Sequence, residues 1–222
     1  MSAAFEISFN ASEANQELFE QIAQQLTTKG FSINPFALPV PLTSCLHEQV
    51  CAMQKAAFEV AGIGRDDAHN LNRFVRRDEI SWISGKTTAE QMWLQWAGAL
   101  QTYLNRRLYL GLFSFESHFA IYGENDFYKR HVDAFKGDSN RILSLVVYLN
   151  PNWTNEDGGE LVLYSNENDV EGVKVIPGLG TVVAFLSEDF PHEVLPAKRE
   201  RISIAGWFRV NGSHHDRVDP PR

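Results

Sequence analysis

The chain has 222 residues, of which 44% are hydrophobic and 22% charged, and its formal net charge is −8. This length favours one domain with a sizeable core, and the composition excludes a long disordered protein, a collagen and a coiled coil. The acidic balance argues against a nucleic-acid partner, and the absence of an apolar run of roughly 18 residues argues against a membrane span.

Two further observations lead us to expect a cytoplasmic protein. The first ten residues, MSAAFEISFN, have neither the basic nor the apolar region of a signal peptide. The chain has two cysteines, Cys45 and Cys51, and no CxxC pair, which fits a reducing compartment.

Three amphipathic helices are predicted in the first half of the chain. The first begins after Asn10 and ends at Gly30. The second is predicted from Thr43 to about Val60, and the third begins at the capping box of residues 87–90. The positions that we expect to be buried on these helices include Leu18, Ile22, Leu26, Leu46, Val50, Trp93, Trp96 and Leu100.

From residue 111 the hydrophobic pattern changes to a period of two, which is typical of strands. Residues 142–149 are continuously apolar, as in a strand that is buried on both faces. Further strands are expected over residues 113–122, 127–133, 161–164, 173–176, 181–186 and 201–210. We therefore predict a mainly β, α+β protein in which helices cover one outer face of a β-sandwich or jelly roll.

Histidine and carboxylate residues indicate a metal site in the β-rich half. His131 and Asp133 are two positions apart in a strand-like segment, so their side chains point to one face. His214 and Asp216 have the same spacing but lie in a polar tail with no later strand to complete a site. His192, in the sequence PHEV, can supply the third ligand. Two histidines and one carboxylate form the facial triad of non-haem Fe(II) enzymes.

An arginine nine residues after the PHEV histidine indicates an anion site. Strand alternation places this residue, Arg201, on one face with Ser203 and Trp207, while Ile202 and Ile204 take the core face. A guanidinium on an enclosed face needs an anion, and its planar fork matches a carboxylate. We therefore expect a dicarboxylate co-substrate that pairs with Arg201 and reaches the metal.

The stretch YKRHVDAFKGDSNRILSLVVYLNPNW, followed by GGELVLY and PHEVLPAKRERISIAGWF, resembles the prolyl-hydroxylase branch of the 2-oxoglutarate and Fe(II)-dependent dioxygenases. It is most similar to the hypoxia-inducible-factor prolyl hydroxylases and their bacterial relatives, over about residues 73–209. The resemblance implies that His131, Asp133 and His192 bind iron. It also implies Fe(II), 2-oxoglutarate and O2 as cofactors, with ascorbate as an accessory reductant.

The resemblance also implies how the co-substrate is held. Arg201 would pair with the far carboxylate of 2-oxoglutarate, and the Tyr148 hydroxyl would bond the same group. Tyr122 would line the pocket near the end of 2-oxoglutarate that chelates the metal. On the residues alone, a tyrosine such as Tyr148 within an apolar strand is more often a core residue with a satisfied hydroxyl.

Four further residues match positions that shape the substrate-binding side in this family. Trp207 would wall the site near the iron, although such a tryptophan is also typical of a core. Arg76, Asp78 and Arg141 would shape the substrate mouth or contact the peptide. A structural Arg–Asp pair at the rim is the alternative explanation for them. Residues 62–75 would form a flap over the substrate.

The implied organisation is one integrated catalytic domain. Residues 1–110 would be a helical support region that includes the mouth segment 62–85. Residues 111–212 would form the double-stranded β-helix, which is the catalytic core, and residues 213–222 a polar tail.

The implied activity is hydroxylation of a prolyl residue in a protein or peptide, coupled to decarboxylation of 2-oxoglutarate to succinate and CO2. No catalytic side chain is expected beyond the metal site, and a translation factor is the substrate that the resemblance suggests. We expect neither a nucleic-acid nor a membrane partner, and the sequence sets no oligomeric state. Two alternatives stay open: the same cofactors acting on a small molecule or another side chain, and a non-catalytic jelly roll that senses 2-oxoglutarate or oxygen.

Overall fold

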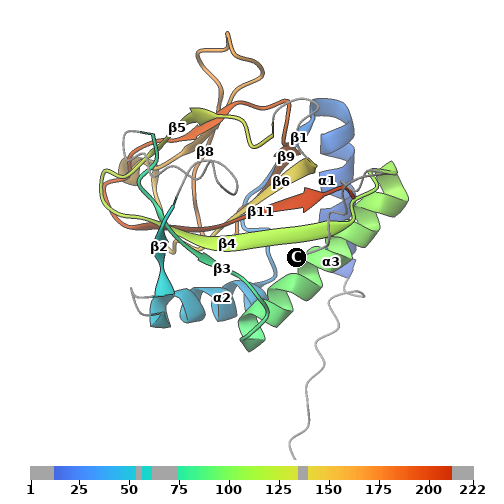
Figure 1. Ribbon diagram of the computed structural model, residues 1–222, viewed down its shortest axis with the longest axis horizontal. Helices are drawn as coiled ribbons and strands as arrows, with labels where there is room; N and C mark the ends of the chain where they lie inside the picture. Colours follow the sequence, from blue (N-terminus) through green and yellow to red (C-terminus); the bar gives the residue numbers. More distant parts are fainter. Residues whose placement is uncertain (1–12, 54–56, 62–74, 135–139, 212–222) are drawn as a thin grey trace, which may run out of the picture.

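A computed structural model describes residues 13–53, 57–61, 75–134 and 140–211 of the chain. It is mainly β, with two antiparallel sheets and three helices, which confirms the predicted fold class (Figure 1). The helices are α1 (Glu13–Lys29), α2 (Val40–Ala52) and α3 (Thr88–Leu108). In the described part of the chain, no helix combines the length and hydropathy of a membrane span.

The larger sheet has seven strands in the order β1-β9-β6-β11-β4-β3-β2. Their bounds are β1 Phe31–Asn34, β2 Glu59–Val60, β3 Glu79–Trp82, β4 Ser114–Tyr122, β6 Arg141–Tyr148, β9 Val182–Leu186 and β11 Arg201–Arg209. The smaller sheet has four strands in the order β5-β10-β7-β8. Their bounds are β5 Tyr128–His131, β7 Leu161–Leu163, β8 Val173–Val175 and β10 His192–Val194, and a short 3₁₀ helix, η4 Asn155–Asp157, precedes β7.

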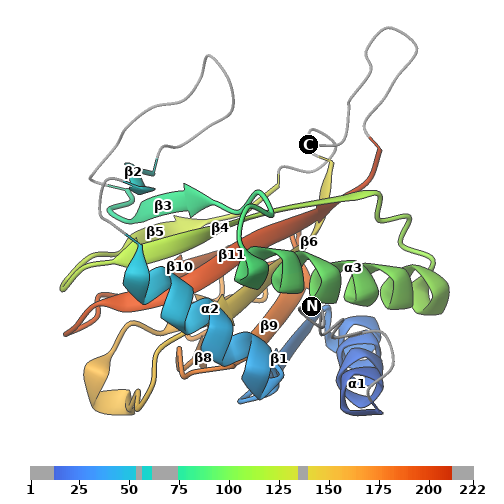
Figure 2. The same ribbon diagram turned by 90° about the horizontal axis from the view of Figure 1, so that it is seen from below.

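The larger sheet is covered on its outer face by the helices, as the sequence predicts, and α2 and α3 run across this face in Figure 2. Alternation along the central strands divides their side chains between two layers. Leu143, Leu145 and Val147 of β6 join the apolar residues of the helices in one core cluster. Tyr148 belongs to a second cluster with residues of the smaller sheet, such as Leu163. The space between the sheets is therefore where a polar site can form.

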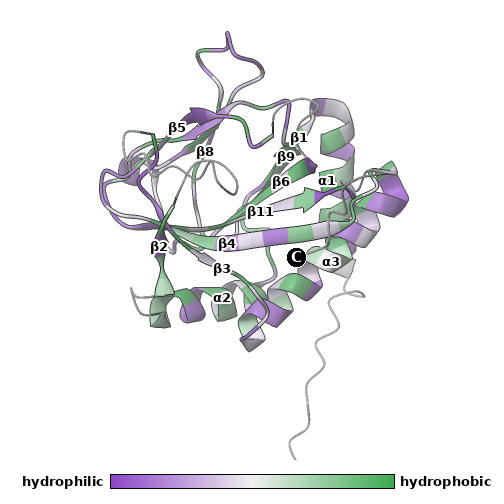
Figure 3. Cartoon of the chain, in the orientation of Figure 1, coloured by the Kyte–Doolittle hydropathy of each residue, from purple (hydrophilic) through white to green (hydrophobic). Residues whose placement is uncertain are grey.

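Hydropathy along the chain follows the same division. Figure 3 shows hydrophobic residues on the helix faces and central strands, and hydrophilic residues on β5 and the outer helix faces. The stacked pair Trp93 and Trp96 of α3 is fully buried, as the spacing predicts, with ring centroids 5.5 Å apart. Burying such large apolar surfaces is the main stabilising contribution to this layer.

The second predicted helix, from Thr43 to about Val60, is wrong at both ends. Helix α2 begins at Val40 because a proline is accepted in the first turn, where a backbone N–H has no intrahelical partner. It ends at Ala52, since Met53 is extended, with φ −68° and ψ 135°. The predicted apolar stripe continued past this end through Met53 and Ala57. Met53 does pack against the core, but from outside the helix, whereas Ala57 is exposed.

Three strands were absent from the sequence interpretation, namely β1, β2 and β10. Strand β1 pairs with β9, and it extends the sheet from the N-terminal region, as β2 and β3 also do. His192 follows the buried strand β9 and begins β10. Of the expected flap, residues 62–75, only the last position lies within the described residues. Asn10, His214, Asp216 and the rest of the expected tail, residues 213–222, lie outside them.

Replacing Thr87 with alanine should lower the free energy of unfolding by about 1 kcal/mol. The Thr87 hydroxyl accepts a hydrogen bond from the Glu90 backbone N–H and caps α3, as the sequence predicts. Urea unfolding would measure the change. Thr102→Ala, in the exposed middle of the same helix, should leave stability almost unchanged, and equal losses in both variants would reject the capping role.

Candidate metal centre and co-substrate pocket

Three potential metal ligands meet between the two sheets. His131 ends β5 and His192 begins β10, and the antiparallel register places them directly opposite each other. The His131 Nε2 lies 3.7 Å from one Asp133 carboxylate oxygen, and the His192 Nε2 lies 3.6 Å from the other. One ligand atom from each residue lies within 4.8 Å of the others. The structure therefore brings together the three residues that the sequence selected for a metal ion.

Backbone hydrogen bonds determine which nitrogen of each imidazole is free. His131 Nδ1 lies 2.8 Å from the Lys129 carbonyl oxygen, and His192 Nδ1 lies 3.0 Å from that of Phe190. Because a carbonyl only accepts, each Nδ1 carries the proton and each Nε2 keeps its lone pair. Burial and the neighbouring His192 lower the pKa of His131 to about 3, so its imidazole is neutral near pH 7. Neutral imidazoles with a free Nε2 are suited to ligate a metal.

Aromatic rings restrain both imidazoles. The Tyr128 ring stacks on His131 with centroids 3.6 Å apart. Phe185, on β9, meets His192 edge-on at 4.8 Å. These contacts restrict the rotation of both ligand side chains and exclude water from the space beside them.

The Asp133 carboxylate is anchored to the larger sheet. Ser144 on β6 donates a 2.6 Å hydrogen bond to Asp133 Oδ2, and the Ser187 hydroxyl lies 2.9 Å from that of Ser144. Burial alone would raise the pKa of Asp133, but His192, His131 and the Ser144 hydroxyl outweigh it and lower this pKa. The carboxylate is therefore the anionic member of the ligand set.

Arg201 lies at the start of β11 with only 1% of its surface exposed. Its Nε donates a 2.8 Å hydrogen bond to the Gly159 carbonyl, and a second guanidinium nitrogen lies 3.3 Å from the Ser203 hydroxyl. Its guanidinium carbon is 5.0 Å from the ring centroids of Tyr122 and Tyr148. Within the described ranges, no carboxylate lies within ion-pair distance of it. A buried cation without an anion is unfavourable, so the pocket fits an anionic ligand.

The two tyrosines beside Arg201 complete this pocket. The Tyr148 side chain is fully buried, and its hydroxyl has no hydrogen-bond partner among the residues that the structure describes. Burial raises the pKa of Tyr148 to about 12, so the hydroxyl stays protonated near neutral pH and can donate a hydrogen bond. Tyr122 faces Arg201 across the β4–β11 ladder, and burial raises its pKa as well. A carboxylate here would satisfy both the guanidinium and the unpartnered Tyr148 hydroxyl.

Arg76 and Asp78 form a buried ion pair near the metal ligands. The Arg76 Nε and Nη2 atoms each donate a 2.6 Å hydrogen bond to the Asp78 carboxylate, which is fully buried. The same guanidinium lies 4.5 Å from the centroid of the Tyr128 ring, which stacks on His131. This is the rim ion pair that the sequence left open as an alternative. Through Arg76, the pair also holds the Tyr128 ring against His131.

Arg141 pairs with Glu116 on the neighbouring part of the larger sheet. Its Nη2 donates a 2.8 Å hydrogen bond to Glu116, and its guanidinium carbon lies 3.7 Å from the centroid of the Trp207 ring. Arg209 also contacts Glu116, at 3.5 Å. The indole N–H of Trp207 is buried and makes no hydrogen bond within the described residues. Trp207 lies between Arg141, which stacks on its ring, and Ser144, which it faces across the sheet and which bonds Asp133.

Several site residues were missed on the sequence, namely Ser144, Ser187, Glu116 and Gly159. A signal did exist for Ser144, because a lone hydroxyl inside the apolar run ILSLVVY shares a face with the buried Tyr148. Gly159 has a positive φ of 71°, and a Cβ there would lie 3.2 Å from Arg201 Cδ. Only glycine fits a backbone that passes so close to the arginine.

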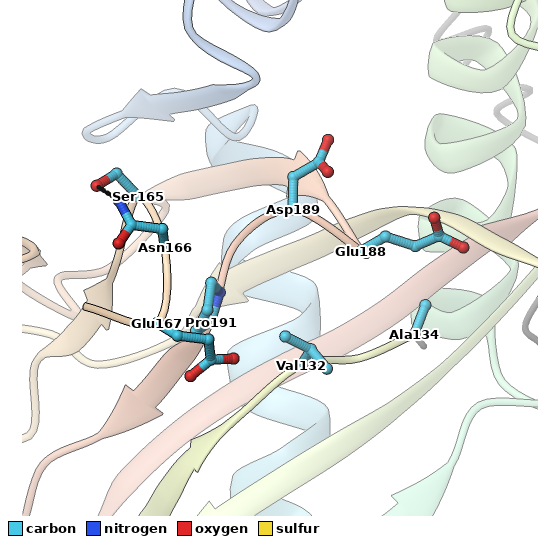
Figure 4. A pocket seen from close by; sticks show the side chains of 8 residues that line it. All are labelled: Val132, Ala134, Ser165, Asn166, Glu167, Glu188, Asp189 and Pro191. Atoms are coloured by element: carbon cyan, nitrogen blue, oxygen red, sulfur yellow. Dashed lines mark hydrogen bonds between the residues drawn. The ribbon is translucent and has the colours of Figure 1, made fainter. Parts of the chain in front are cut away.

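Two neighbouring features take no part in the metal centre. His118 is buried with its ring centroid 5.1 Å from that of Trp82, and burial lowers its pKa to about 4. A separate cleft of about 530 Å³ lies beside the ligand segment (Figure 4). It is lined by Val132, Ala134, Ser165, Asn166, Glu167, Glu188, Asp189 and Pro191. The side chains of the three metal ligands do not line this cleft.

The donor set fits a non-haem iron ion and a dicarboxylate co-substrate. Two neutral imidazoles and one carboxylate leave coordination positions open, as Fe(II) oxygenases require. The Arg201 pocket supplies the buried cation and the unpartnered donor that a carboxylate needs. When bound, the iron would supply oxygen activation, which protein side chains alone do not provide.

Comparison with known proteins places this site in a described family. Residues 117–209 match the model of the 2OG-Fe(II) oxygenase superfamily. The hypoxia-inducible factor prolyl hydroxylase of Caenorhabditis elegans is 37% identical over 102 residues, which are 45% of this chain and 14% of that protein. The chain spans a small part of the curated relatives that it matches, 14% and 20% of their lengths.

Two prolyl hydroxylases are among the solved structures that match most of the chain. The crystal structure of a Pseudomonas putida prolyl-4-hydroxylase has a TM-score of 0.77 and 36% identity, and the match covers 87% of this chain and 100% of that one. A prolyl hydroxylase of Trichoplax adhaerens, in complex with a peptide fragment of the hypoxia inducible factor oxygen degradation domain, has a TM-score of 0.75 and 29% identity. That match covers 88% of this chain and 90% of the other.

Proposed function

Because this chain belongs to the 2OG-Fe(II) oxygenase superfamily, we propose that it hydroxylates a prolyl residue in a protein or peptide. It is a 2-oxoglutarate-dependent dioxygenase whose cofactors are Fe(II), 2-oxoglutarate and O2. The observation that carries the proposal is the His131–Asp133–His192 set beside a buried Arg201 that lacks a carboxylate partner. The 36% identity to a prolyl-4-hydroxylase over that chain's full length supports the choice of proline.

In this proposal the ligand residues hold Fe(II) through two imidazole Nε2 atoms and a carboxylate. Arg201 would bind the far carboxylate of 2-oxoglutarate through its planar fork, and the Tyr148 hydroxyl would donate a hydrogen bond to the same carboxylate. Tyr122 closes the pocket on the side of β4. These contacts orient the co-substrate, and the buried tyrosines keep water away from it.

The substrate would approach past Trp207 and Arg141. Their stacked arrangement presents a guanidinium beside an indole, which suits an extended peptide because backbone carbonyls accept hydrogen bonds and proline packs on aromatic rings. Arg76 and Asp78 would shape this side by restraining Tyr128. The peptide in the Trichoplax adhaerens complex supports a macromolecular substrate for this chain.

The proposal extends to the whole chain and its setting. Residues 1–110, 111–212 and 213–222 would act as support region, catalytic core and tail of one integrated domain. We place the protein in the cytoplasm because its two cysteines and the absence of a CxxC pair fit a reducing compartment. We take a proline of a translation factor as its substrate on the family resemblance. Ascorbate would serve as an accessory reductant.

The direct test is to incubate the Fe(II)-loaded protein with 2-oxoglutarate, air and a proteome extract. Mass spectrometry should find a peptide that gains about 16 Da on proline, and a parallel sample should accumulate succinate, because each hydroxylation consumes one 2-oxoglutarate. The same incubation with the Arg201→Lys protein at low 2-oxoglutarate should show less of both products.

The other results of this incubation would each replace the proposal. A gain on another residue would keep the cofactors and change the substrate class. Succinate without any modified peptide would indicate a small-molecule substrate. If neither succinate nor a modified peptide forms, the protein is better explained as a non-catalytic binding or sensing module.

A further inference from the structure

Two buried serines hold the Asp133 carboxylate. Ser144 is 1% exposed and Ser187 is fully buried, so neither is available to a substrate. The Ser144 hydroxyl lies 2.6 Å from Asp133 Oδ2, and the two serine oxygens are 2.9 Å apart. Burying two hydroxyls is unfavourable unless each makes a hydrogen bond, and these two bond in series toward a metal ligand.

The direction of this hydrogen-bonded series follows from the charge on Asp133. An ionised carboxylate only accepts, so Ser144 must use its one proton in the bond to Oδ2. The Ser144 oxygen is then an acceptor, and Ser187 must donate to it. The order is Ser187 to Ser144 to Asp133, and each hydroxyl sets the rotamer of the next.

The strands make this arrangement rigid. Ser144 lies directly opposite Phe185 on one neighbouring strand and Trp207 on the other. Phe185 contacts His192, and Ser144 itself donates a hydrogen bond to Asp133. One row across three strands therefore restrains two of the three metal ligands, and Ser144 is its middle member.

We propose that Ser144, oriented by Ser187, is a positioning residue that keeps Asp133 a one-oxygen ligand. Because Oδ2 is engaged by the serine, Oδ1 is the oxygen left for the metal. A facial triad of three ligand atoms leaves three of six positions open, whereas a carboxylate bound through both oxygens would occupy one of these. This inference rests on the proposed function, which needs those open positions for 2-oxoglutarate and O2.

The test uses Co(II) as a spectroscopic probe of the metal site, without 2-oxoglutarate. In Ser144→Ala the dissociation constant for Co(II) should rise about tenfold, the scale typical of lost partners of metal ligands. The visible absorption of the Co(II) complex should also change, because the carboxylate is free to bind through both oxygens. Ser187→Ala should shift both readouts in the same direction by less, and it tests the series even if Ser144→Ala does not fold.

Ser117→Ala is the matched control. Ser117 is equally buried and bonds Trp93 in the helix-facing core, away from the metal ligands, so its Co(II) spectrum should match the wild type. A wild-type Co(II) affinity and spectrum in a folded Ser144→Ala protein would overturn the inference. This assay does not involve proline, so the two proposals can fail separately. The Co(II) result can reject the role of Ser144 while a hydroxylated peptide is still found, and it can support that role when no hydroxylated peptide is found.

Discussion

Replacing His131 with alanine should abolish succinate formation and weaken Fe(II) binding by more than about 100-fold. Loss of a hydrogen-bonding partner of a metal ligand typically weakens binding by about 10- to 100-fold, and His131 is itself a proposed ligand. Its removal leaves His192 and Asp133, two ligand atoms that do not define a facial triad. Anaerobic titration with Fe(II) would measure the affinity, and NMR of succinate the turnover.

His47→Ala is the control for this variant. His47 is a half-buried histidine on α2 whose Nδ1 lies 2.9 Å from the Leu149 carbonyl oxygen. It contacts none of the proposed ligands, and both Fe(II) binding and turnover should persist without it. Wild-type Fe(II) affinity in His131→Ala would show that the metal binds elsewhere.

The central strands could be predicted because alternation acts within a few residues. Arg201 and Trp207 share one face of β11, while Ile204 takes the other, as the parity argument requires. The ligand set was also predictable, since the HxD spacing is local and the second histidine lies in a distinctive sequence. These features depend on residue type and short spacing, which a single sequence contains.

Contacts between distant segments were not predictable in the same way. Ser144 bonds an aspartate eleven residues earlier, and Arg141 bonds Glu116 twenty-five residues away. Neither spacing corresponds to a repeat within one helix or strand, so only the register of the sheet brings the partners together. Strand β1 was missed for a related reason, because four residues are stabilised by pairing with β9 rather than by their own pattern.

Replacing Arg201 with lysine should raise the dissociation constant for 2-oxoglutarate about 10- to 100-fold while Fe(II) binding survives. A hydrogen bond to a charged group contributes about 1.5–3 kcal/mol, and each 1.4 kcal/mol is tenfold in affinity. Lysine keeps the charge but loses the planar fork, and it cannot donate to Gly159 and a carboxylate in the same geometry. Anaerobic titration of the Fe(II) protein with 2-oxoglutarate, followed by its charge-transfer absorption, would measure the change.

Arg199→Lys separates this effect from a general loss of charge. Arg199 is two residues away, pairs with Asp157 and lies over the Trp153 ring, and it is partly exposed. Both substitutions keep the formal charge of the chain, so long-range electrostatics is the same in the two variants. Only Arg201 has a buried guanidinium beside the unpartnered Tyr148 hydroxyl, so only its replacement should weaken 2-oxoglutarate binding. Equal affinities in the two variants would mean that the co-substrate carboxylate binds at another cation.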